Sequence, residues 1–246
     1  MITYIYDGSF DGLLSCIYKA FYSKEKPESI VSELELIENF LMEKEYIKAD
    51  TEKSGRVYRA IEEKIGKNSL RRVFFTYLSN IEGREMIILR YLQLGFKMGK
   101  DVDLNLADRD VLGVDKIYSR VSKERHRLTG LLRFKRIREG ILYAKVEPDH
   151  DVIGLLAPHF EKRLKNENFI IHDTKRSIAV FYNKEEWIIK GIESRDSFLV
   201  KEKEEGIYED LWRVYFDSIS IKRKANPKLQ RNNMPRRYWK NLTEKN

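Results

Sequence analysis

The chain has 246 residues, of which 42% are hydrophobic and 35% are charged, with 47 Lys and Arg against 39 Asp and Glu. This length can bury the core of one large domain or two small ones, and the composition excludes a disordered chain of low hydrophobicity. The one cysteine, Cys16, excludes an internal disulfide, a thiolate zinc site and a self-contained iron–sulfur cluster, because each needs several sulfurs. We therefore expect no cofactor in this chain and assign any redox metal chemistry to a partner.

The sequence also predicts where the protein resides. No apolar stretch approaches the roughly 18 to 20 residues that cross a bilayer, and residues 1–7 lack the basic start and apolar region of a signal peptide. We therefore expect a cytoplasmic protein without membrane contact.

The formal net charge of +8 is concentrated in two segments. Residues 116–145 carry 10 basic and 2 acidic groups, and residues 219–246 carry 9 and 1, whereas residues 1–50 carry 5 and 10. Clustered Lys and Arg are typical of proteins that bind a polyphosphate, because each neutralised phosphate releases condensed counterions. The alternative is a solvated surface, or pairing with the acidic segments of the same chain.

The N-terminal part is predicted to be mostly helical after one short strand, residues 3–6. Apolar residues at helical spacing follow the loop 7–9, and Ser9 is a plausible N-cap; the alternative is a catalytic role for the loop. Residues 24–47 suggest a loop with one helix, and residues 51–99 are helical in pattern throughout.

A long helix is predicted from about Val111 to Leu128. One face of it carries basic residues spaced by four, three and four positions, which only Glu124 interrupts. These residues are Lys116, Arg120, Lys123 and Arg127. We favour a phosphate-facing stripe over a solvated face.

The hydrophobic period changes from 3.6 to 2 after Leu128, which predicts a β-hairpin of residues 131–137 and 141–146. One face would carry cations and an aromatic ring, namely Arg133, Lys135, Tyr143 and Lys145, and the other Leu132, Phe134, Leu142 and Ala144. Nucleic-acid-binding sheets combine cations with rings in this way, whereas Lys and Arg on an edge strand also prevent aggregation.

A helix with Pro158 near a kink or restart is predicted next, followed by strands at 169–173, 177–182 and 186–190, an exposed stretch at 193–206 and a helix at 207–221. The predicted fold class is α+β: a mostly helical N-terminal part, an antiparallel sheet of about five strands with an inserted helix, and a C-terminal helix plus basic arm. The corresponding regions are 1–110, 111–218 and 219–246, unless they form one composite domain.

Candidate catalytic groups gather around the histidines of residues 124–176. Asp149 and Asp151 flank His150 and could orient or polarise its imidazole as in an acid–base pair; His126 and His159 are further candidates. The alternative is that they serve as turn residues and helix caps. No spacing typical of a metal site is present, so we predict none in this chain.

Further candidate phosphate ligands are Arg163 and Arg176, which could reach a phosphate from one end of the sheet. The C-terminal arm adds Arg231, Arg236, Tyr238 and Trp239, which could clamp a nucleic-acid backbone and stack on a base. Alternatively, the aromatic residues of the arm anchor a short terminal helix to the core.

The ordered motifs of the chain resemble a bacterial family whose members are described as DNA metabolism or repair proteins, with a domain of unknown function. The motifs that carry the resemblance are Tyr4–Phe10, Glu124–Arg127 with Gly130 and Arg133-Phe134, Tyr143-Ala144 with Glu147-Pro148 and His150, Ala157–Phe160 with Arg163, Asp173 with Arg176, and Met234-Pro235 with Tyr238-Trp239. The resemblance implies a gene beside one for a radical SAM protein, which would hold the iron–sulfur cluster and S-adenosylmethionine, and occasional fusion to a uracil-DNA-glycosylase-like domain. It implies no catalytic residue.

Three functions are therefore open at this point. The first is a DNA-binding component of a repair or modification system that acts with a radical SAM partner. The second is a DNA-base-processing enzyme, glycosylase-like or hydrolytic, and the third is a non-catalytic scaffold. No nucleophile elbow, P-loop or dinucleotide fingerprint is present, which argues against the common hydrolases, NTPases and Rossmann dehydrogenases.

Overall fold

The computed structural model describes residues 2–36, 43–137, 140–192 and 231–242. The chain divides into two compact units, Met1–Ser122 and Lys123–Asn246, and the boundary falls inside one continuous helix, α5 (Arg109–Leu131). The mixed α/β composition confirms the predicted α+β class. The predicted stretch 193–206, the helix 207–221 and the first part of the basic arm lie outside the described residues.

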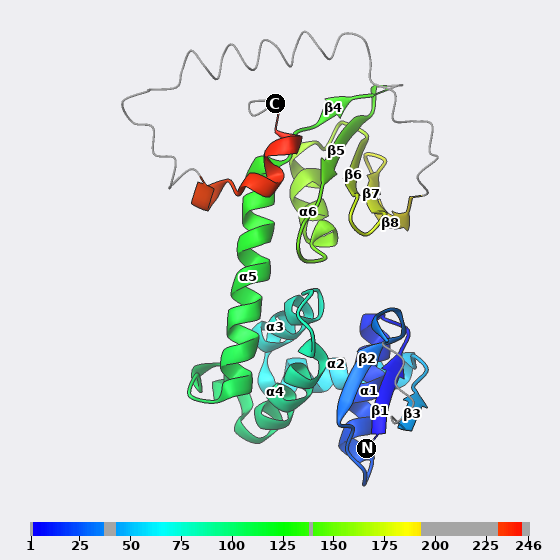
Figure 1. Cartoon of the computed structure of the whole chain (residues 1–246), viewed down its shortest axis with the longest axis vertical. Helices are drawn as coiled ribbons and strands as arrows, with labels where there is room; N and C mark the ends of the chain where they lie inside the picture. The colour runs from blue at the N-terminus through cyan, green and yellow to red at the C-terminus, as the bar shows by residue number, and fades with distance from the viewer. Residues whose placement is uncertain (1, 37–42, 138–139, 193–230, 243–246) are drawn as a thin grey trace. The chain divides into compact units, whose positions relative to one another are not determined.

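The first unit combines a small sheet with a group of helices (Figure 1). Its elements before α5 are β1 (Ile2–Tyr6), α1 (Phe10–Tyr22), β2 (Ser29–Ser32), η1 (Glu33–Glu35), β3 (Glu43–Tyr46), α2 (Thr51–Ala60), the π-helical turn η2 (Ile61–Ile65), α3 (Lys67–Tyr77), α4 (Arg84–Met98) and η3 (Gly99–Leu104).

The sheet of this unit is parallel, with β1 between β2 and β3. The prediction of one leading strand and of a loop with one helix at 24–47 is wrong here, because β2 and β3 lie in that segment. Both strands have four residues and are the edges of the sheet. Their length and polar residues leave too weak an alternation to be recognised from sequence, and only pairing with the buried β1 makes them strands.

The loop between β1 and α1 has the predicted capping role. The Ser9 hydroxyl accepts a hydrogen bond from the Gly12 N–H at 2.9 Å, which satisfies one of the open donors at the start of the helix. Asp7 Oδ1 accepts from the Ser9 backbone N–H at 3.0 Å, and the Tyr77 hydroxyl donates to the Gly8 carbonyl at 2.7 Å. These contacts hold the loop in one shape.

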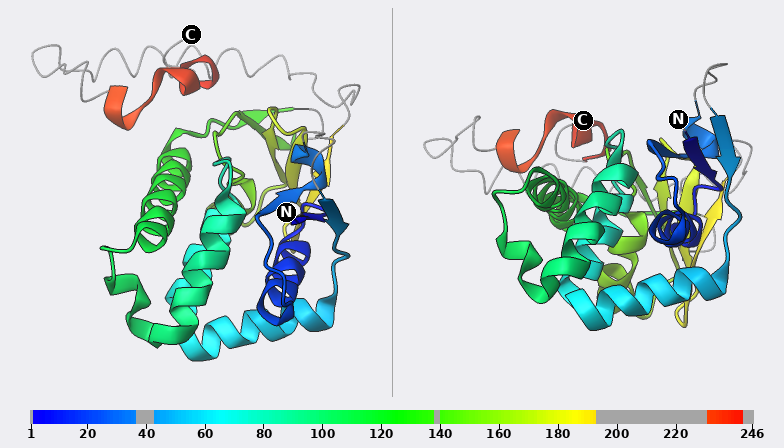
Figure 2. Two further views of the ribbon diagram at one scale, coloured as in Figure 1. Left: turned by 60° about the horizontal axis from the view of Figure 1, so that its bottom comes forward. Right: turned by 90° about the horizontal axis from the view of Figure 1, so that it is seen from below.

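The predicted helical pattern of 51–99 is confirmed. It is interrupted at glycines that have positive φ angles, a conformation that other residues rarely adopt. Gly66, Gly83 and Gly99 have φ angles of 128°, 72° and 71°, and they separate η2, α3, α4 and η3. The apolar faces of these helices and of α1 share one core with β1, and α1 packs closely on α2 (Figure 2). Burial of these faces, rather than helix propensity, stabilises the unit.

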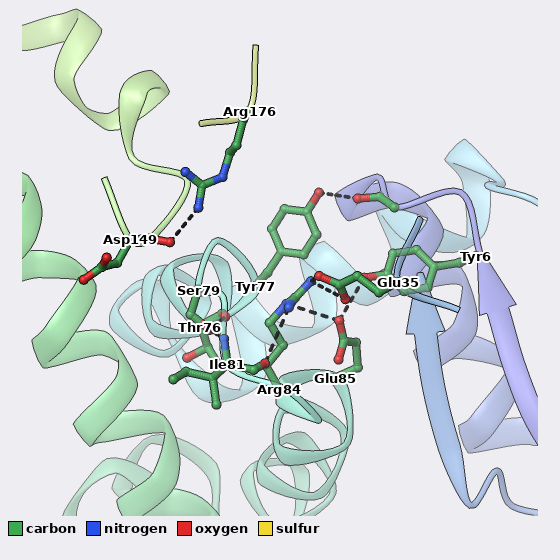
Figure 3. A network of polar contacts seen from close by, with 11 residues as sticks. Tyr6, Glu35, Thr76, Tyr77, Ser79, Ile81, Arg84, Glu85, Asp149 and Arg176 are labelled. Atoms are coloured by element: carbon green, nitrogen blue, oxygen red, sulfur yellow. Dashed lines mark hydrogen bonds and ion pairs between the residues drawn. The ribbon is translucent and has the colours of Figure 1, made fainter. Parts of the chain in front are cut away.

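A buried polar network joins the end of β1 to the start of α4 (Figure 3). The Tyr6 hydroxyl donates to Glu85 Oε1 at 3.2 Å, and Arg84 Nη2 donates to both carboxylate oxygens of Glu35 at 3.0 and 3.1 Å. Burial raises the pKa of Glu85, although the Arg84 guanidinium opposes this effect. The network ties η1 to α4 and leaves these charges paired.

The second unit contains the C-terminal part of α5 and a five-stranded sheet. Its further elements are β4 (Lys135–Arg136), β5 (Leu142–Val146), α6 (Ile153–Arg163), β6 (Phe169–Asp173), β7 (Ile178–Tyr182), β8 (Trp187–Gly191) and the 3₁₀ helix η7 (Arg236–Asn241). The strands lie in the order β4-β5-β6-β7-β8.

The sheet is mixed rather than purely antiparallel, which corrects the sequence prediction. β5 and β6 run parallel, because α6 connects them and returns the chain to the same end of the sheet (Figure 1). The other three pairs are antiparallel. The last three strands start and end within one residue of their predicted bounds.

Two predicted elements have different bounds. The strand predicted at 131–137 is only Lys135–Arg136, because α5 extends to Leu131 and the Leu132 N–H still donates to the Leu128 carbonyl. The restart predicted near His159 is wrong, because α6 is continuous through Pro158.

One core of the second unit lies between α6 and one face of the sheet, and a second cluster of buried apolar residues, which includes Tyr143, Ile170 and Ala179, lies on the other face. The Phe134 ring meets Phe160 of α6 edge-on at 5.1 Å and Phe169 of β6 at 5.9 Å, and Phe169 contacts Tyr182 at 4.8 Å. The predicted apolar side of the hairpin, which carries Phe134, thus faces α6, and the side that carries Lys135 and Tyr143 faces the opposite way. Among the described residues, no helix is long and apolar enough to span a membrane.

Candidate nucleic-acid interface

A small basic pocket lies on the sheet face opposite α6. Lys135 of β4 pairs in register with Tyr143 of β5, so that these residues and the alternate positions Arg133 and Lys145 share one face. The pocket has a volume of about 190 Å³. It is lined by Arg133, Lys135, Ile137, Tyr143, Lys145, Lys240 and Asn241. The structure therefore brings the predicted hairpin face together with η7 of the C-terminal arm.

The lining of this pocket is strongly cationic. Among the described residues that line it, four are Lys or Arg and none is acidic. Lys240 Nζ contacts Glu147 Oε2 at 2.5 Å, and this ion pair lowers the pKa of Glu147. Arg133 Nη1 donates to the Gly130 carbonyl at 2.8 Å, which orients the guanidinium. The described lining of the pocket thus has an excess of basic residues.

Tyr143 is held in place at the pocket by His172, which was not among the predicted site residues. The Tyr143 hydroxyl and His172 Nδ1 form a hydrogen bond of 2.7 Å, and both side chains are buried. Burial raises the pKa of Tyr143 to about 12, so that the phenol is neutral at pH 7. The hydrogen bond satisfies both polar groups on β5 and β6 and fixes the ring.

Glu124 of α5 organises the surroundings of the site. Its side chain is 3% exposed and its carboxylate accepts four hydrogen bonds. The donors are the Asp149 N–H at 2.9 Å, the His150 N–H at 2.9 Å, Arg237 Nη2 at 3.1 Å and the Tyr238 hydroxyl at 2.5 Å. One carboxylate therefore connects α5, the loop after β5 and the C-terminal segment.

The ionisation of Glu124 reflects these contacts. Burial acts to raise its pKa, but the hydrogen bonds from Tyr238 and from the backbone of Asp149 and His150 outweigh burial and hold the pKa below its usual value. Arg237 also pairs with Asp149 Oδ2 at 2.6 Å, which links two carboxylates through one guanidinium. Glu124 is thus a structural anion at neutral pH.

Two of the predicted acid–base candidates, Asp149 and His150, lie beside this anion and donate their backbone N–H groups to it. His150 is 7% exposed, and burial lowers its pKa although Glu124 and Asp149 oppose the effect. Burial raises the pKa of Asp151. His126 and His159 are exposed on α5 and α6, respectively. None of these residues lines the basic pocket.

Arg176 occupies a structural position between β6 and β7. Its guanidinium contacts Asp173 Oδ2 at 2.8 Å and donates to the carbonyls of Pro148 and Asp149 at 3.2 and 2.6 Å; Figure 3 shows the contact with Asp149. These bonds hold the loop that contains His150. Arg163 is exposed at the end of α6.

The basic residues of α5 are mostly exposed. Both alternatives, a phosphate-facing stripe and a solvated face, predict this exposure. Lys116, Arg120 and Lys123 are exposed and Arg127 is half-buried, whereas Glu124 points inward to the second unit. Glu124 therefore does not interrupt the stripe.

The C-terminal segment anchors itself through its aromatic residues, which confirms one of the two predicted roles. Tyr238 is 2% exposed, and the Trp239 indole donates to the Met234 carbonyl at 2.8 Å. Arg231 and Arg236 are exposed, and the Arg236 guanidinium lies 5.7 Å from the centroid of the Trp239 ring.

Several groups that define the site were not predicted. Lys240 and Arg237 are two of them, and because both lie in the predicted basic arm, its charge density could have identified them. The roles of Glu124 and His172 depend on partners 25 to 114 residues away, and no local pattern reveals them. In the described parts of the chain, no group of three or more His, Cys, Asp or Glu side chains is arranged to hold a metal ion.

A family model described as a domain of unknown function, DUF4130, matches residues 82–244. The chain belongs to this family. The match covers more than half of the chain and includes the basic pocket, the Glu124 contacts and α5. No curated protein sequence matches the chain.

Proposed function

We propose that the second unit of this DUF4130 protein binds DNA and that its basic pocket holds a phosphate of the DNA. The observation that carries the proposal is the pocket lining, in which four cations and a fixed tyrosine surround one small cavity. Phosphate contacts from Lys and Arg supply most of the affinity of proteins for nucleic acids. The described part of the lining contains no acidic residue, which suits this ligand.

Other exposed cations would extend the contact along the DNA backbone. Lys123 and Arg127 belong to the same unit as the pocket, and Arg231 and Arg236 lie in the segment that contributes Lys240. Each neutralised phosphate releases counterions, so that these residues would add to affinity without adding sequence specificity.

The biological context in this proposal is DNA repair or modification with a radical SAM partner. The family resemblance of the motifs supports this context, as does the single cysteine, which cannot by itself hold an iron–sulfur cluster. Cys16 is fully buried in the first unit, and burial raises its pKa to about 12, so that it is a poor ligand and nucleophile. The cluster would therefore belong to the partner.

The experiment is a fluorescence-anisotropy titration of the full chain with labelled single-stranded and duplex oligonucleotides at several salt concentrations. The logarithm of the affinity should fall linearly with the logarithm of salt, with about 0.9 in slope per duplex phosphate contact and about 0.7 per single-strand contact. Lys123→Gln and Arg127→Gln should each weaken binding and reduce the slope by roughly one contact.

The matched control is Lys162→Gln, which removes one exposed cation from α6, outside the pocket lining. It should leave affinity and slope unchanged. An affinity that does not depend on salt, or that falls equally in the control, would refute the proposal. A chain that binds no DNA but co-purifies with a protein partner would instead support the scaffold function.

A second candidate, base processing, is favoured by one observation. Burial lowers the pKa of His150 and raises the pKa of Asp151, which shifts His150 toward a neutral base and Asp151 toward a neutral acid. The test is cleavage of oligonucleotides with damaged bases, followed by alkali treatment. Activity that is lost in His150→Gln and Asp151→Asn, with the folded state intact by circular dichroism, would support it; no strand cleavage by the wild-type chain would exclude it.

A further inference from the structure

Two hollows on the first unit adjoin at a pair of tyrosines in α1. Tyr18 and Tyr22 are one helical turn apart, and their ring centroids lie 4.6 Å apart with the planes tilted by 37°. Both residues line both hollows. Tyr22 is 76% exposed, so its ring packs against Tyr18 and still offers much of its surface to a ligand.

Further aromatic residues lie in the two hollows. The first hollow lies between α1, the end of β3 and the start of α2, and it is lined by Tyr46, which is 62% exposed. The second lies between α1, α2 and α4, where Phe21 and Phe96 meet edge-on at 5.3 Å. Together with Tyr18 and Tyr22 these residues form one aromatic surface on the first unit.

Cations surround the aromatic surface. The described lining of the two hollows contains one acidic residue, Asp50, and five basic ones, Lys19, Lys48, Lys53, Arg56 and Lys64. Three of the cations are paired: Lys19 with Glu45, Lys53 with Asp50 at 2.9 Å, and Arg56 with Glu52 at 2.6 Å. The basic residues outnumber these carboxylates even when all three are counted, so a negatively charged ligand is favoured without breaking a pair.

Exposed tyrosine rings beside cations match what an unpaired nucleic-acid strand requires. Every base has a π-face that can stack on an aromatic ring, and Lys and Arg hold the backbone. In a duplex these faces are already stacked on the neighbouring base pairs, so only an unpaired strand can offer them. A proline-rich peptide also docks on exposed aromatic rings, but it has no negative backbone for the cations to bind.

We propose that the aromatic surface of the first unit binds single-stranded nucleic acid by base stacking. One base stacks on Tyr22, where it extends the pair with Tyr18, and another stacks on Tyr46. Lys48 and Lys53 bind the phosphates between them. The proposal concerns a different unit from the basic pocket and does not depend on DNA binding by the second unit.

The test is fluorescence anisotropy of the full chain with labelled oligothymidylate, oligouridylate and an abasic strand of the same length, which has the phosphates but no bases. Wild-type protein should bind one of the base-containing strands about tenfold more tightly than the abasic strand, because a stacked base contributes on this order. The tighter of the two identifies DNA or RNA as the source of the bases.

Replacement of single rings assigns the effect to this surface. Tyr22→Ala and Tyr46→Ala should each weaken binding of the base-containing strand about tenfold and leave binding of the abasic strand unchanged, whereas Tyr22→Phe keeps the ring and should bind as wild type. The matched control is Tyr58→Ala, because Tyr58 is an exposed tyrosine of α2 that lines neither hollow. A thermal melt verifies that each of these surface variants remains folded.

Several outcomes would overturn the inference. They are equal affinity for base-containing and abasic strands, an equal loss in Tyr58→Ala, and a loss in Tyr22→Phe as large as in Tyr22→Ala. Binding of a proline-rich peptide that Tyr22→Ala abolishes, with oligonucleotide binding unchanged, would assign the surface to a peptide instead.

Duplex DNA separates this inference from the proposed function. Tyr22→Ala should leave duplex binding unchanged, whereas Lys123→Gln in the second unit should weaken it. Absence of duplex binding would overturn the proposed function alone, and single-strand binding that does not respond to Tyr22→Ala or Tyr46→Ala would overturn this inference alone.

Discussion

Replacement of Glu124 by Gln tests whether this carboxylate organises the second unit. The Glu124 side chain is 3% exposed, Oε1 accepts from three donors, and Oε2 accepts from the His150 N–H. A Gln carbonyl could replace Oε1, but its amide would then face the His150 N–H, donor against donor. An unsatisfied buried donor costs about 1 to 3 kcal/mol.

The three remaining hydrogen bonds would also lose the contribution of the charge. Bonds to charged groups contribute about 1.5 to 3 kcal/mol and neutral ones about 1 kcal/mol, so the loss is about 0.5 kcal/mol or more for each bond. The sum predicts a decrease of about 3 kcal/mol in the free energy of unfolding, within a range of about 2 to 5 kcal/mol. Tyr238→Phe removes only one of the donors and should cost about 1 kcal/mol.

The assay is urea unfolding followed by circular dichroism, with limited proteolysis of the C-terminal segment as a local measurement. Both Glu124→Gln and Tyr238→Phe should make the segment around residues 231–242 easier to cleave, because Glu124 anchors it. The control is Glu186→Gln on the surface, which should change the unfolding free energy by less than about 0.5 kcal/mol. A Glu124→Gln protein as stable as this control would refute the reasoning.

Three further predictions concern single contacts. Tyr143→Phe removes the hydrogen bond to His172 and leaves a buried ring nitrogen with one partner fewer, so urea unfolding should show a loss of about 1 to 3 kcal/mol; an unchanged midpoint would contradict this role. The lowered pKa of Glu124 implies stability that is fully present above its unfolded value near pH 4.5 and is lost as the pH falls through the lower folded value. Unfolding measured between pH 6 and 3 should therefore show a steeper acid loss in wild type than in Glu124→Gln, and identical slopes would disprove it. Ser9→Ala removes the N-cap of α1 and should cost about 1 kcal/mol in a thermal melt, whereas Ser9→Thr should restore most of it; equal melting points for all three proteins would exclude the cap.

The hairpin shows how far local patterning can identify a site. The alternation of residues 131–146 predicted which side chains share a face, and the pocket contains the predicted Arg133, Lys135 and Tyr143. This succeeded because side chains alternate across a strand whatever the sheet around it. The predicted start of the first hairpin strand was wrong because the apolar residues Leu131 and Leu132 suit a helix end as well as a strand. In the structure α5 ends at Leu131, and β4 begins only at Lys135.

Glu124 shows where local patterning stops. In the sequence it is an acidic residue that interrupts a basic stripe, and helical spacing places it beside Arg120 and Arg127 without indicating a partner. Its function as an acceptor for Asp149, His150 and Tyr238 depends on a loop and a terminal segment that are distant in sequence. The same holds for the pairing of Tyr143 with His172, which follows from the parallel register of β5 and β6.

The sequence by itself determined the α+β class, the positions of most helices and of the last strands, and the concentration of positive charge in two segments. These properties follow from hydrophobic period, capping residues and composition, which act over a few residues. Only the tertiary structure decided that β2 and β3 complete a parallel sheet, that β5 and β6 run parallel, and that Lys240 of the second basic segment joins Arg133, Lys135 and Lys145 of the first in one pocket. Strand pairing and the meeting of distant charges depend on how segments that are far apart in the sequence pack together. That packing is fixed by burial and by long-range hydrogen bonds, which no short stretch of sequence contains.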